Sequence, residues 1–185
     1  MQALNTEANF IKQLRDPKTK EKAFLELLDK YQERLYWYIR KIVISHENAD
    51  DASQNTFIRI YRNIESFKGN SSLATWMFRI AHNEALRLLE KQNKTHLASL
   101  DDVKPSYLED LTQDPYFDGD ETKLKLHHVI DSKLTNKQRM VFNMKYFDNL
   151  SFREISQILE VNENTLKSAY YSATKIIEEE MIQTF

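Results

Sequence analysis

The sequence predicts an all-α protein with two helical domains joined by an acidic linker. Among its 185 residues there are only 2 glycines and 3 prolines, too few for the many tight turns of a β-sandwich or barrel. Apolar residues recur every three or four positions along most of the chain, and no useful stretch alternates as a strand does. Because hydrophobic residues make up 41% of the chain, it can bury a core, which excludes wholesale disorder.

The N-terminal part contains four predicted helices. Three of them follow from apolar residues at helical spacing: residues 6–15, 18–44 and 48–64. A loop around Gly69 comes next, and Ser71 or Ser72 can cap a fourth helix that runs to about residue 94.

The middle of the chain is acidic. Residues 96–121 hold 1 Lys or Arg against 8 Asp or Glu, whereas residues 1–95 hold 16 against 12 and residues 122–185 hold 9 against 8. Acids that repel one another, with Pro105 and Pro115 among them, predict a linker between two domains with those boundaries. From the residues alone, it either packs a few side chains on the domains or docks in a positively charged channel of a partner.

The C-terminal part predicts four more helices. The first covers residues 122–133. Thr135 and Gln138 form one capping box and Ser151 and Glu154 another, each at the start of a helix. A turn at residues 161–163 then leads into a last helix from about Asn164 to Met181. Two short helices joined by a tight turn suit a helix-turn-helix, whose second helix enters the DNA major groove.

Catalytic and cofactor motifs are missing from the sequence. There is no cysteine, no Gly-rich nucleotide loop and no HExxH pair. The pair His46 and Asp50 fits capping or a solvated surface better than a metal site. We therefore expect neither an enzyme nor a cofactor. No run of 18 apolar residues and no signal peptide is visible, so we expect no membrane insertion and a cytoplasmic location.

Two segments carry groups suited to nucleic acid. The loop from Phe67 leads into a helix whose free backbone N–H groups suit phosphates, while its amide and hydroxyl side chains suit base edges. Phe67 or Trp76 could stack on a base; alternatively, both are core anchors. In the last helix, Leu166, Tyr170, Ala173 and Ile177 should face inward, which leaves its polar residues outward.

Three motifs resemble the extracytoplasmic-function (ECF) sigma factors of bacterial RNA polymerase, a group of the sigma-70 family. Residues 49–62, ADDASQNTFIRIYR, are similar to the family's AEDLVQETFLRVWR. Residues 67–83, FKGNSSLATWMFRIAHN, are similar to FRGDSSFRTWLYRIARN. Residues 134–142 and 146–152 are similar to LPERQREVF and YFEGLSY. The resemblance extends from about residue 8 to 183.

The resemblance implies a transcription initiation factor that binds core RNA polymerase and recognises a bipartite promoter. Residues 1–95 would correspond to sigma region 2 and residues 122–185 to region 4, with the linker threaded through the polymerase. The implied polymerase-binding residues are Asp50, Asp51, Gln54, Phe57 and Arg59. Those implied to read and melt the −10 element are Phe67, Asn70, Ser71, Ser72, Thr75, Trp76, Arg79 and Asn83. Those for the −35 element are Asn164, Thr165, Lys167, Ser168, Tyr171 and Lys175. By family habit, an anti-sigma factor is expected as a further partner.

The chain departs from the family pattern in its last helix and the turn before it. Ala169, Ser172 and Thr174 stand at positions that are habitually basic, and Glu160 replaces a turn glycine. These departures keep two alternatives open: a sigma-like regulator that does not itself initiate transcription, and a helical protein–protein adaptor.

For the segment of residues 49–62, we expect charge reversal at Asp51 and Arg59 to weaken polymerase binding without unfolding the domain.

Overall fold

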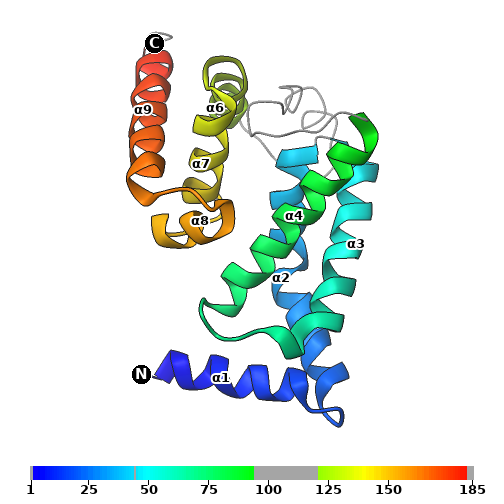
Figure 1. Cartoon of the computed structure of the whole chain (residues 1–185). Helices are drawn as coiled ribbons and strands as arrows, with labels where there is room; N and C mark the ends of the chain where they lie inside the picture. Colours follow the sequence, from blue (N-terminus) through cyan, green and yellow to red (C-terminus); the bar gives the residue numbers. More distant parts are fainter. Residues whose placement is uncertain (1, 44, 94–120, 183–185) are drawn as a thin grey trace. The chain divides into compact units, whose positions relative to one another are not determined.

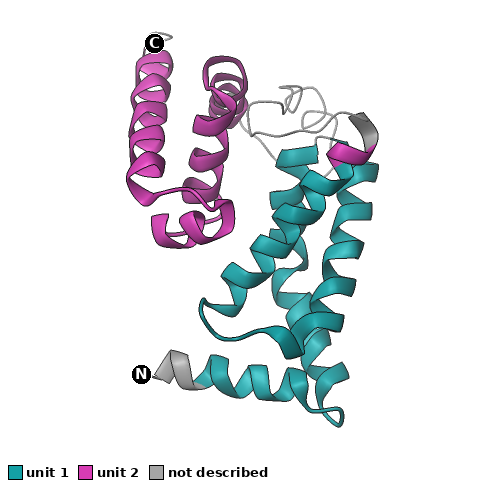
Figure 2. Cartoon of the chain, in the orientation of Figure 1, with its two compact units in different colours: residues 1–88 teal, residues 89–185 magenta. Residues whose placement is uncertain are grey.

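The computed structural model describes residues 2–43, 45–93 and 121–182, which form eight α-helices and one 3-10 turn without a strand (Figure 1). This confirms the all-α prediction. The chain divides into two compact units, Met1–Leu88 and Leu89–Phe185 (Figure 2). The predicted linker lies outside the described residues except for its last residue, Glu121, where a helix begins.

The first unit is built on two long helices. Its elements are α1 (Gln2–Arg15), α2 (Lys20–Val43), α3 (His46–Asn63), the 3-10 turn η1 (Ile64–Ser66) and most of α4 (Leu73–Asn93), whose residues from Leu89 on are counted in the second unit. α2 packs along α3, and α1 packs on α2 and η1. Leu27, Leu35, Ile39 and Met77 are fully buried because apolar residues at helical spacing form one continuous inward stripe on each helix.

The second unit is organised around its last helix. Its elements are α6 (Glu121–Lys133), α7 (Asn136–Tyr146), α8 (Phe152–Leu159) and α9 (Glu163–Ile182). α9 packs against the other three. Both predicted capping boxes are present: Thr135 with Gln138 and Ser151 with Glu154. Each satisfies two backbone N–H groups reciprocally and so defines where its helix begins.

Two residues in this unit have left-handed backbone conformations without being glycine. Glu160, which ends α8, has φ +58° and ψ +33°, and Asn149 has φ +55°. In the family motif YFEGLSY a glycine stands at the position of Asn149. Asn tolerates this conformation, but a longer side chain such as Glu pays a steric penalty. The turn before α9 therefore keeps the left-handed conformation and carries the steric penalty of a glutamate in it.

Candidate functional site

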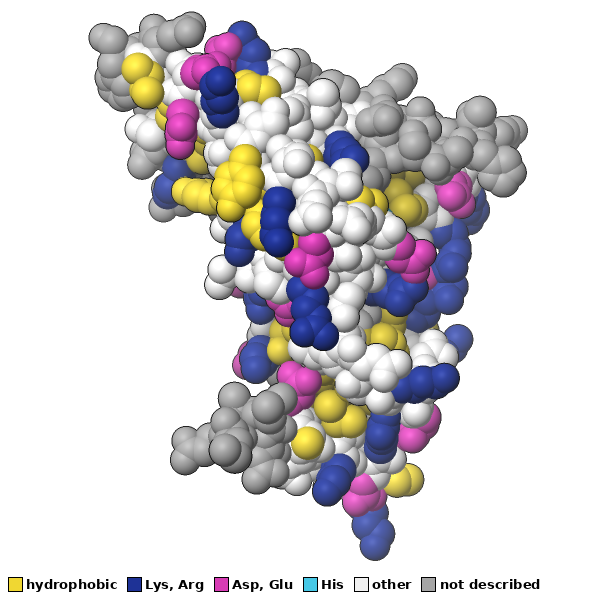
Figure 3. Space-filling model, turned by 60° about the vertical axis from the view of Figure 1, so that its left-hand side comes forward, with side chains coloured by type: hydrophobic (Ala, Val, Ile, Leu, Met, Phe, Trp, Pro, Cys, Tyr) yellow, Lys and Arg dark blue, Asp and Glu magenta, His cyan; other side chains and the backbone are white. Residues whose placement is uncertain are grey.

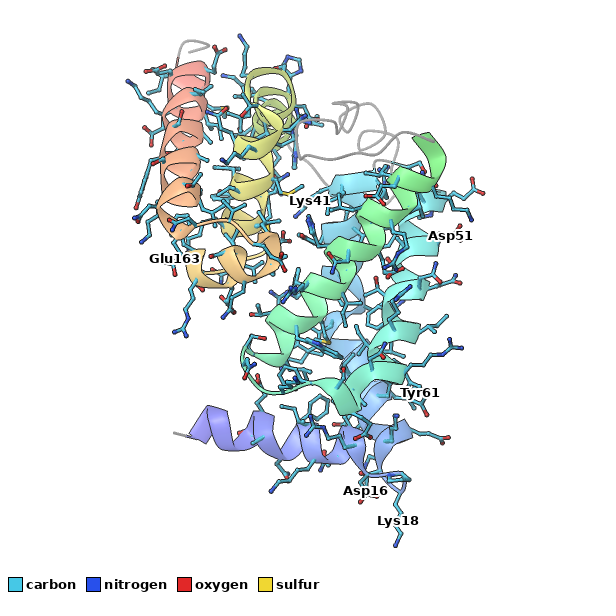
Figure 4. The ribbon with its side chains drawn as sticks, viewed as in Figure 1. Asp16, Lys18, Lys41, Asp51, Tyr61 and Glu163 are labelled. Carbon is cyan, nitrogen blue, oxygen red and sulfur yellow. The ribbon has the colours of Figure 1, made fainter. Side chains whose placement is uncertain are left out.

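Helix α3 presents most of the residues predicted to bind polymerase to solvent. Ser45 caps the helix by accepting a hydrogen bond from the Asn48 N–H. Along the exposed face lie Asp50, Asp51, Gln54 and Arg59, and Figure 4 shows Asp51 and Tyr61 projecting from this helix. Phe57 differs, since it is only 8% exposed and belongs to the core of the first unit.

Arg59 has a structural partner that the sequence does not reveal. Its Nε lies 2.5 Å from Oε1 of Glu84 on α4, and Glu84 is only 7% exposed. Arg87, one turn further along α4, donates a hydrogen bond to the same carboxylate oxygen. A buried carboxylate is stable only when it is paired. Arg59 therefore joins α3 to α4 in addition to offering charge at the surface.

The exposed face of α3 also carries hydrophobic side chains that the sequence analysis did not select. Ile58 and Tyr61 are exposed, as is Leu25 on the neighbouring helix α2. Tyr61 packs edge-on against Phe24, with the ring centroids 4.9 Å apart. The sequence could have placed Ile58 on this face, because Ile58 lies seven residues after Asp51 and so on the same side of the helix.

The loop before α4 exposes three of its residues, Lys68, Gly69 and Asn70. Gly69 has φ +74°, a conformation that other residues adopt with strain. Ser72 caps α4: its Oγ accepts from the Thr75 N–H at 3.1 Å and lies 2.8 Å from the Thr75 hydroxyl. The predicted serine cap is confirmed, and Thr75 is 2% exposed and directed inward.

The aromatic residues of this segment lie at different depths. Phe67 is 5% exposed and its ring centroid lies 5.3 Å from that of the half-buried Trp76. This burial supports the alternative that Phe67 is a core anchor. Trp76, Arg79 and Asn83 are spaced by three and four residues and so share one side of α4, on which Arg79 and Asn83 are exposed.

The start of α4 already has acceptors for two of its backbone N–H groups. The Leu73 N–H donates to Oε1 of Glu7 at 3.1 Å, and the Thr75 N–H donates to Ser72. Two of the backbone donors expected to be free there are therefore occupied, one by a carboxylate from α1 and one by a serine hydroxyl. Side chains are therefore the main polar groups that this loop offers.

His82 lies inside the first unit, between the exposed Arg79 and Asn83. Its Nδ1 is 3.0 Å from the Tyr38 hydroxyl. Burial lowers the pKa of His82 from 6.5 to about 4, because the charged form loses its hydration. The imidazole is therefore neutral at pH 7.

In the second unit, α8 and α9 form the expected helix-turn-helix. Leu166, Ala173 and Ile177 are buried, and Tyr170 packs against the same core, so the predicted inward face is confirmed. The exposed residues of α9 include Asn164, Thr165, Ser168, Tyr171 and Lys175. Tyr171 is 63% exposed.

The two lysines predicted to contact DNA each have an acid one turn away. Lys167 Nζ lies 3.7 Å from Oε2 of Glu163, which begins α9 (Figure 4). Lys175 Nζ lies 3.9 Å from Oε1 of Glu179. Figure 3 shows the same mixing of basic and acidic side chains over the face that it draws. The recognition helix thus has a weaker positive field than its lysines alone suggest.

The start of α9 is capped locally. The Asn164 N–H donates to Oδ1 of Asn162 at 2.9 Å, so this donor is already satisfied.

At the C-terminal end of α7, Tyr146 and Phe147 are exposed beside the buried Phe142. This exposed aromatic pair is a surface that the sequence analysis did not select.

Metal-ligand clusters and membrane-spanning helices are both absent from the part of the chain that the structure describes. Within residues 2–43, 45–93 and 121–182, no three His, Cys, Asp or Glu side chains are grouped so that they could hold a metal ion. Among the same residues, no helix combines the length and hydrophobicity that crossing a bilayer requires.

Comparison with known protein families gives two matches in chain order. Residues 27–95 match the Sigma-70 region 2 model and residues 131–176 match a Sigma-70 region 4 model. The chain is 29% identical over 181 residues to the ECF RNA polymerase sigma factor SigW of Bacillus subtilis, covering 92% of this chain and 94% of SigW. It is 27% identical over 176 residues to the ECF RNA polymerase sigma-E factor of Haemophilus influenzae, covering 85% and 87%.

Solved structures show the same fold. The sigma factor RpoE of Bartonella quintana, in a co-crystal structure with the anti-sigma factor NepR, superposes with a TM-score of 0.66 at 19% identity, covering 86% of this chain and 97% of RpoE. CnrH, in complex with the cytosolic domain of CnrY, also gives 0.66, at 17% identity and with 94% and 95% covered.

Proposed function

The chain belongs to the ECF sigma factors of the sigma-70 family, and from this premise we propose which of its exposed residues bind polymerase and which read the promoter. As a sigma factor it directs core RNA polymerase to promoters and supports transcription initiation. The observation that carries the residue assignment is that both family-matched segments present polar side chains to solvent on helices held by separate cores.

Polymerase binding is assigned to the exposed face of α3. Asp50, Asp51 and Gln54 supply polar groups there. Ile58, which lies between them and Tyr61 along the helix, adds an exposed apolar side chain. A partly apolar centre with a charged rim is the usual composition of a protein interface. Phe57 supports the face from the core, and Arg59 contributes while also holding Glu84.

Recognition of the −10 element is assigned to the loop 68–72 and to one side of α4. Asn70 and Asn83 offer amide groups that read base edges, Arg79 offers charge for the backbone, and the partly exposed Trp76 offers a stacking surface. Ser71 and Ser72 complete the loop. Phe67 and Thr75 act from the interior by holding Trp76 and the helix cap.

Recognition of the −35 element is assigned to α9. Thr165, Ser168 and Tyr171 are exposed hydrogen-bonding groups, and Asn164, Lys167 and Lys175 flank them. Each lysine has an acid one turn away, so this unit alone should bind DNA weakly and depend on polymerase for effective concentration. Residues 96–121 would connect the two units through the polymerase, where an acidic segment suits a channel built for nucleic acid.

An anti-sigma factor is the proposed regulatory partner, since the sigma factor RpoE, which shares the fold, was solved in complex with the anti-sigma factor NepR. Like transcription factors of its family, the chain would act in the cytoplasm without covalent chemistry of its own.

Run-off transcription with purified core polymerase and a promoter library tests the proposal. We expect transcripts that depend on the added chain and start downstream of a shared bipartite motif. Polymerase binding without any transcript would instead favour the regulator that cannot initiate, for which the weakly basic α9 is the motivating observation. Absence of both polymerase and DNA binding would favour the adaptor.

A further inference from the structure

Helix α1 reaches the start of α4 through a single carboxylate. Oε1 of Glu7 accepts a hydrogen bond from the Leu73 N–H at 3.1 Å, across 66 positions of sequence. Leu73 is the first residue of α4, where backbone N–H groups lack helical partners and the helix dipole favours a negative charge. Glu7 therefore occupies the position where a phosphate would otherwise be attracted.

The same helix holds the other end of the loop through Arg15. Its Nε donates to the Ile64 carbonyl at 3.4 Å, and its Nη2 donates to the Phe67 carbonyl. Leu14 beside it is 1% exposed and anchors this end of α1 in the core. Glu7 and Arg15 lie eight residues apart, about 12 Å along a helix, so one helix holds both ends of the segment between η1 and α4.

Between these two contacts, Ser71 and Ser72 are held by hydrogen bonds at the start of α4, whereas residues 68–70 project into solvent. Lys68, Gly69 and Asn70 are exposed, and Gly69 adopts a left-handed conformation with no neighbouring atom near its missing side chain. Glycine gives the backbone many alternatives. The long-range polar contacts from α1 therefore restrict the loop at the positions where it enters and leaves the exposed segment.

We propose that α1 is a positioning element for base recognition: Glu7 and Arg15 hold the loop 68–72 in the conformation that reads the −10 element. This rests on the proposed role of that loop. Helix α1 lies outside the segment that matches the region 2 model, which begins at residue 27. Because Glu7 occupies the start of α4, the loop selects bases through side chains rather than by binding a phosphate there.

The test uses holoenzyme assembled from core polymerase and the full chain, on a promoter selected by the wild type. The variants are Glu7→Ala, Glu7→Gln, which keeps an acceptor without the charge, and Arg15→Gln. Lys12→Ala is the matched control, since Lys12 is exposed on the same helix. Three quantities are measured: holoenzyme affinity, permanganate reactivity of the promoter bubble, and discrimination between the selected −10 element and its single-base variants.

We expect Glu7→Ala to leave holoenzyme affinity unchanged, to reduce open complexes about three- to ten-fold and to lower base discrimination, as loss of a helix cap would. Glu7→Gln should fall between Glu7→Ala and wild type, Arg15→Gln should resemble Glu7→Ala, and Lys12→Ala should match wild type. Lower discrimination between bases is the decisive readout. A mere loss of folded protein would reduce open-complex formation on all promoter variants equally.

Two results would overturn the inference. One is unchanged discrimination in soluble Glu7→Gln and Arg15→Gln variants, even if Glu7→Ala fails to fold. The other is stronger opening in Glu7→Gln, which would make Glu7 a competitor of a DNA phosphate rather than a support. If instead Asn70→Ala and Asn83→Ala also leave discrimination intact, the proposed role of the loop itself fails.

Discussion

The two units support their predicted contact residues in different ways. In the first unit, polar contacts cross between elements: Arg59 on α3 meets Glu84 on α4, and Glu7 on α1 meets the start of α4. In the second unit, the predicted DNA-contacting lysines meet acids one turn away on their own helix, as Lys167 does with Glu163. Long-range contacts fix geometry between elements, whereas local pairs mainly adjust charge.

This difference matches the tasks proposed for the units. Reading an unstacked base needs polar groups in fixed positions, because a mismatched base leaves buried polar groups unpaired. Recognition of the upstream duplex DNA by an exposed helix depends less on contacts between elements of the protein. The DNA groove and the polymerase already limit where that helix can lie. The predictions below alter one unit at a time, beginning with the largest expected change.

Acid should destabilise the first unit through His82. Folding lowers the pKa of His82 from 6.5 to about 4, so between these values the unfolded chain binds a proton that the folded chain does not. Stability is therefore complete above pH 6.5 and falls as the pH drops toward 4, by about 3 kcal/mol in all. Denaturant unfolding at several pH values, monitored through hydrogen exchange in peptides from α4, measures this loss.

The control is His82→Gln, which removes the titrating group but keeps a hydrogen-bonding side chain near Tyr38. It should be less stable at pH 7 and should lose less stability on acidification. An equal loss in wild type and variant would show that carboxylates, rather than His82, cause the acid sensitivity.

Charge reversal at Arg59 should damage the fold of the first unit. Arg59→Glu places a second carboxylate beside the buried Glu84. Arg87 still pairs with Glu84 and Arg59 is partly exposed, so we expect a loss of about 2 kcal/mol in unfolding free energy. The expectation that charge reversal at Asp51 and Arg59 weakens polymerase binding without unfolding the domain stays a prediction, to which the structure adds a loss of stability at Arg59.

Asp51→Lys is the matched variant for polymerase binding, because Asp51 is exposed on the same helix (Figure 4). Its effect on stability should stay within about 0.5 kcal/mol, while retention on core polymerase should fall. Wild-type retention by folded Asp51→Lys would remove Asp51 from the proposed interface. A fully stable Arg59→Glu would show that the ion pair contributes nothing.

Removing an amide from the surface proposed to read the −10 element should impair promoter opening. Asn70→Ala or Asn83→Ala should reduce open complexes about ten-fold, the scale of one lost specific base contact, with little change in holoenzyme assembly. Permanganate footprinting of the bubble measures the effect, with Gln32→Ala on the exposed face of α2 as control. An unchanged bubble in both variants would make this surface structural only.

Helix positions and starts could be predicted well from the sequence because their causes are local. The capping boxes at Thr135 and Ser151 place two helices to within a residue, and apolar spacing gives the inward face of α9. The left-handed residue Glu160 stands where the family pattern has a glycine. Helix α1, expected from residue 6, begins at Gln2, since nothing in the sequence marks an N-cap there.

The depth of individual site residues could not be predicted in the same way. Phe57 and Thr75 fall within motifs implied to bind, yet both are buried. A motif records which residues occur together without separating contact residues from those that support them. The partners of Arg59 and of the Leu73 N–H come from helices far away in the sequence, so only the fold brings them together.

Relieving the left-handed residue before α9 should stabilise the second unit. Glu160→Gly removes the steric penalty at φ +58°, for a gain of about 1 kcal/mol after the entropy cost of glycine. Asn149→Gly is the matched variant, with an expected change below about 0.5 kcal/mol because Asn already tolerates this conformation. Denaturant unfolding of residues 122–185 measures both. A loss of stability in Glu160→Gly would mean that the glutamate side chain compensates for its strain.

The smallest expected change concerns the salt dependence of DNA binding by α9. Each phosphate contact by a lysine adds roughly 0.9 to the slope of log affinity against log salt. Because α9 lacks several habitual basic residues and its lysines pair with acids, residues 122–185 should bind promoter DNA weakly and with a shallow slope. Lys167→Ala should lower that slope by about 0.9 if Lys167 contacts a phosphate.

Glu163→Gln separates the two explanations for weak binding. It frees Lys167 from its acid while leaving every lysine in place, so affinity and slope should both rise if the pairing with Glu163 is what weakens binding. Ala169→Arg adds a new cation at a half-buried position of the same helix, so both affinity and slope should rise. Titrations at several salt concentrations distinguish the outcomes. A steep slope equivalent to about six phosphate contacts in the wild-type domain would show that a basic surface outside the exposed face of α9 carries the binding.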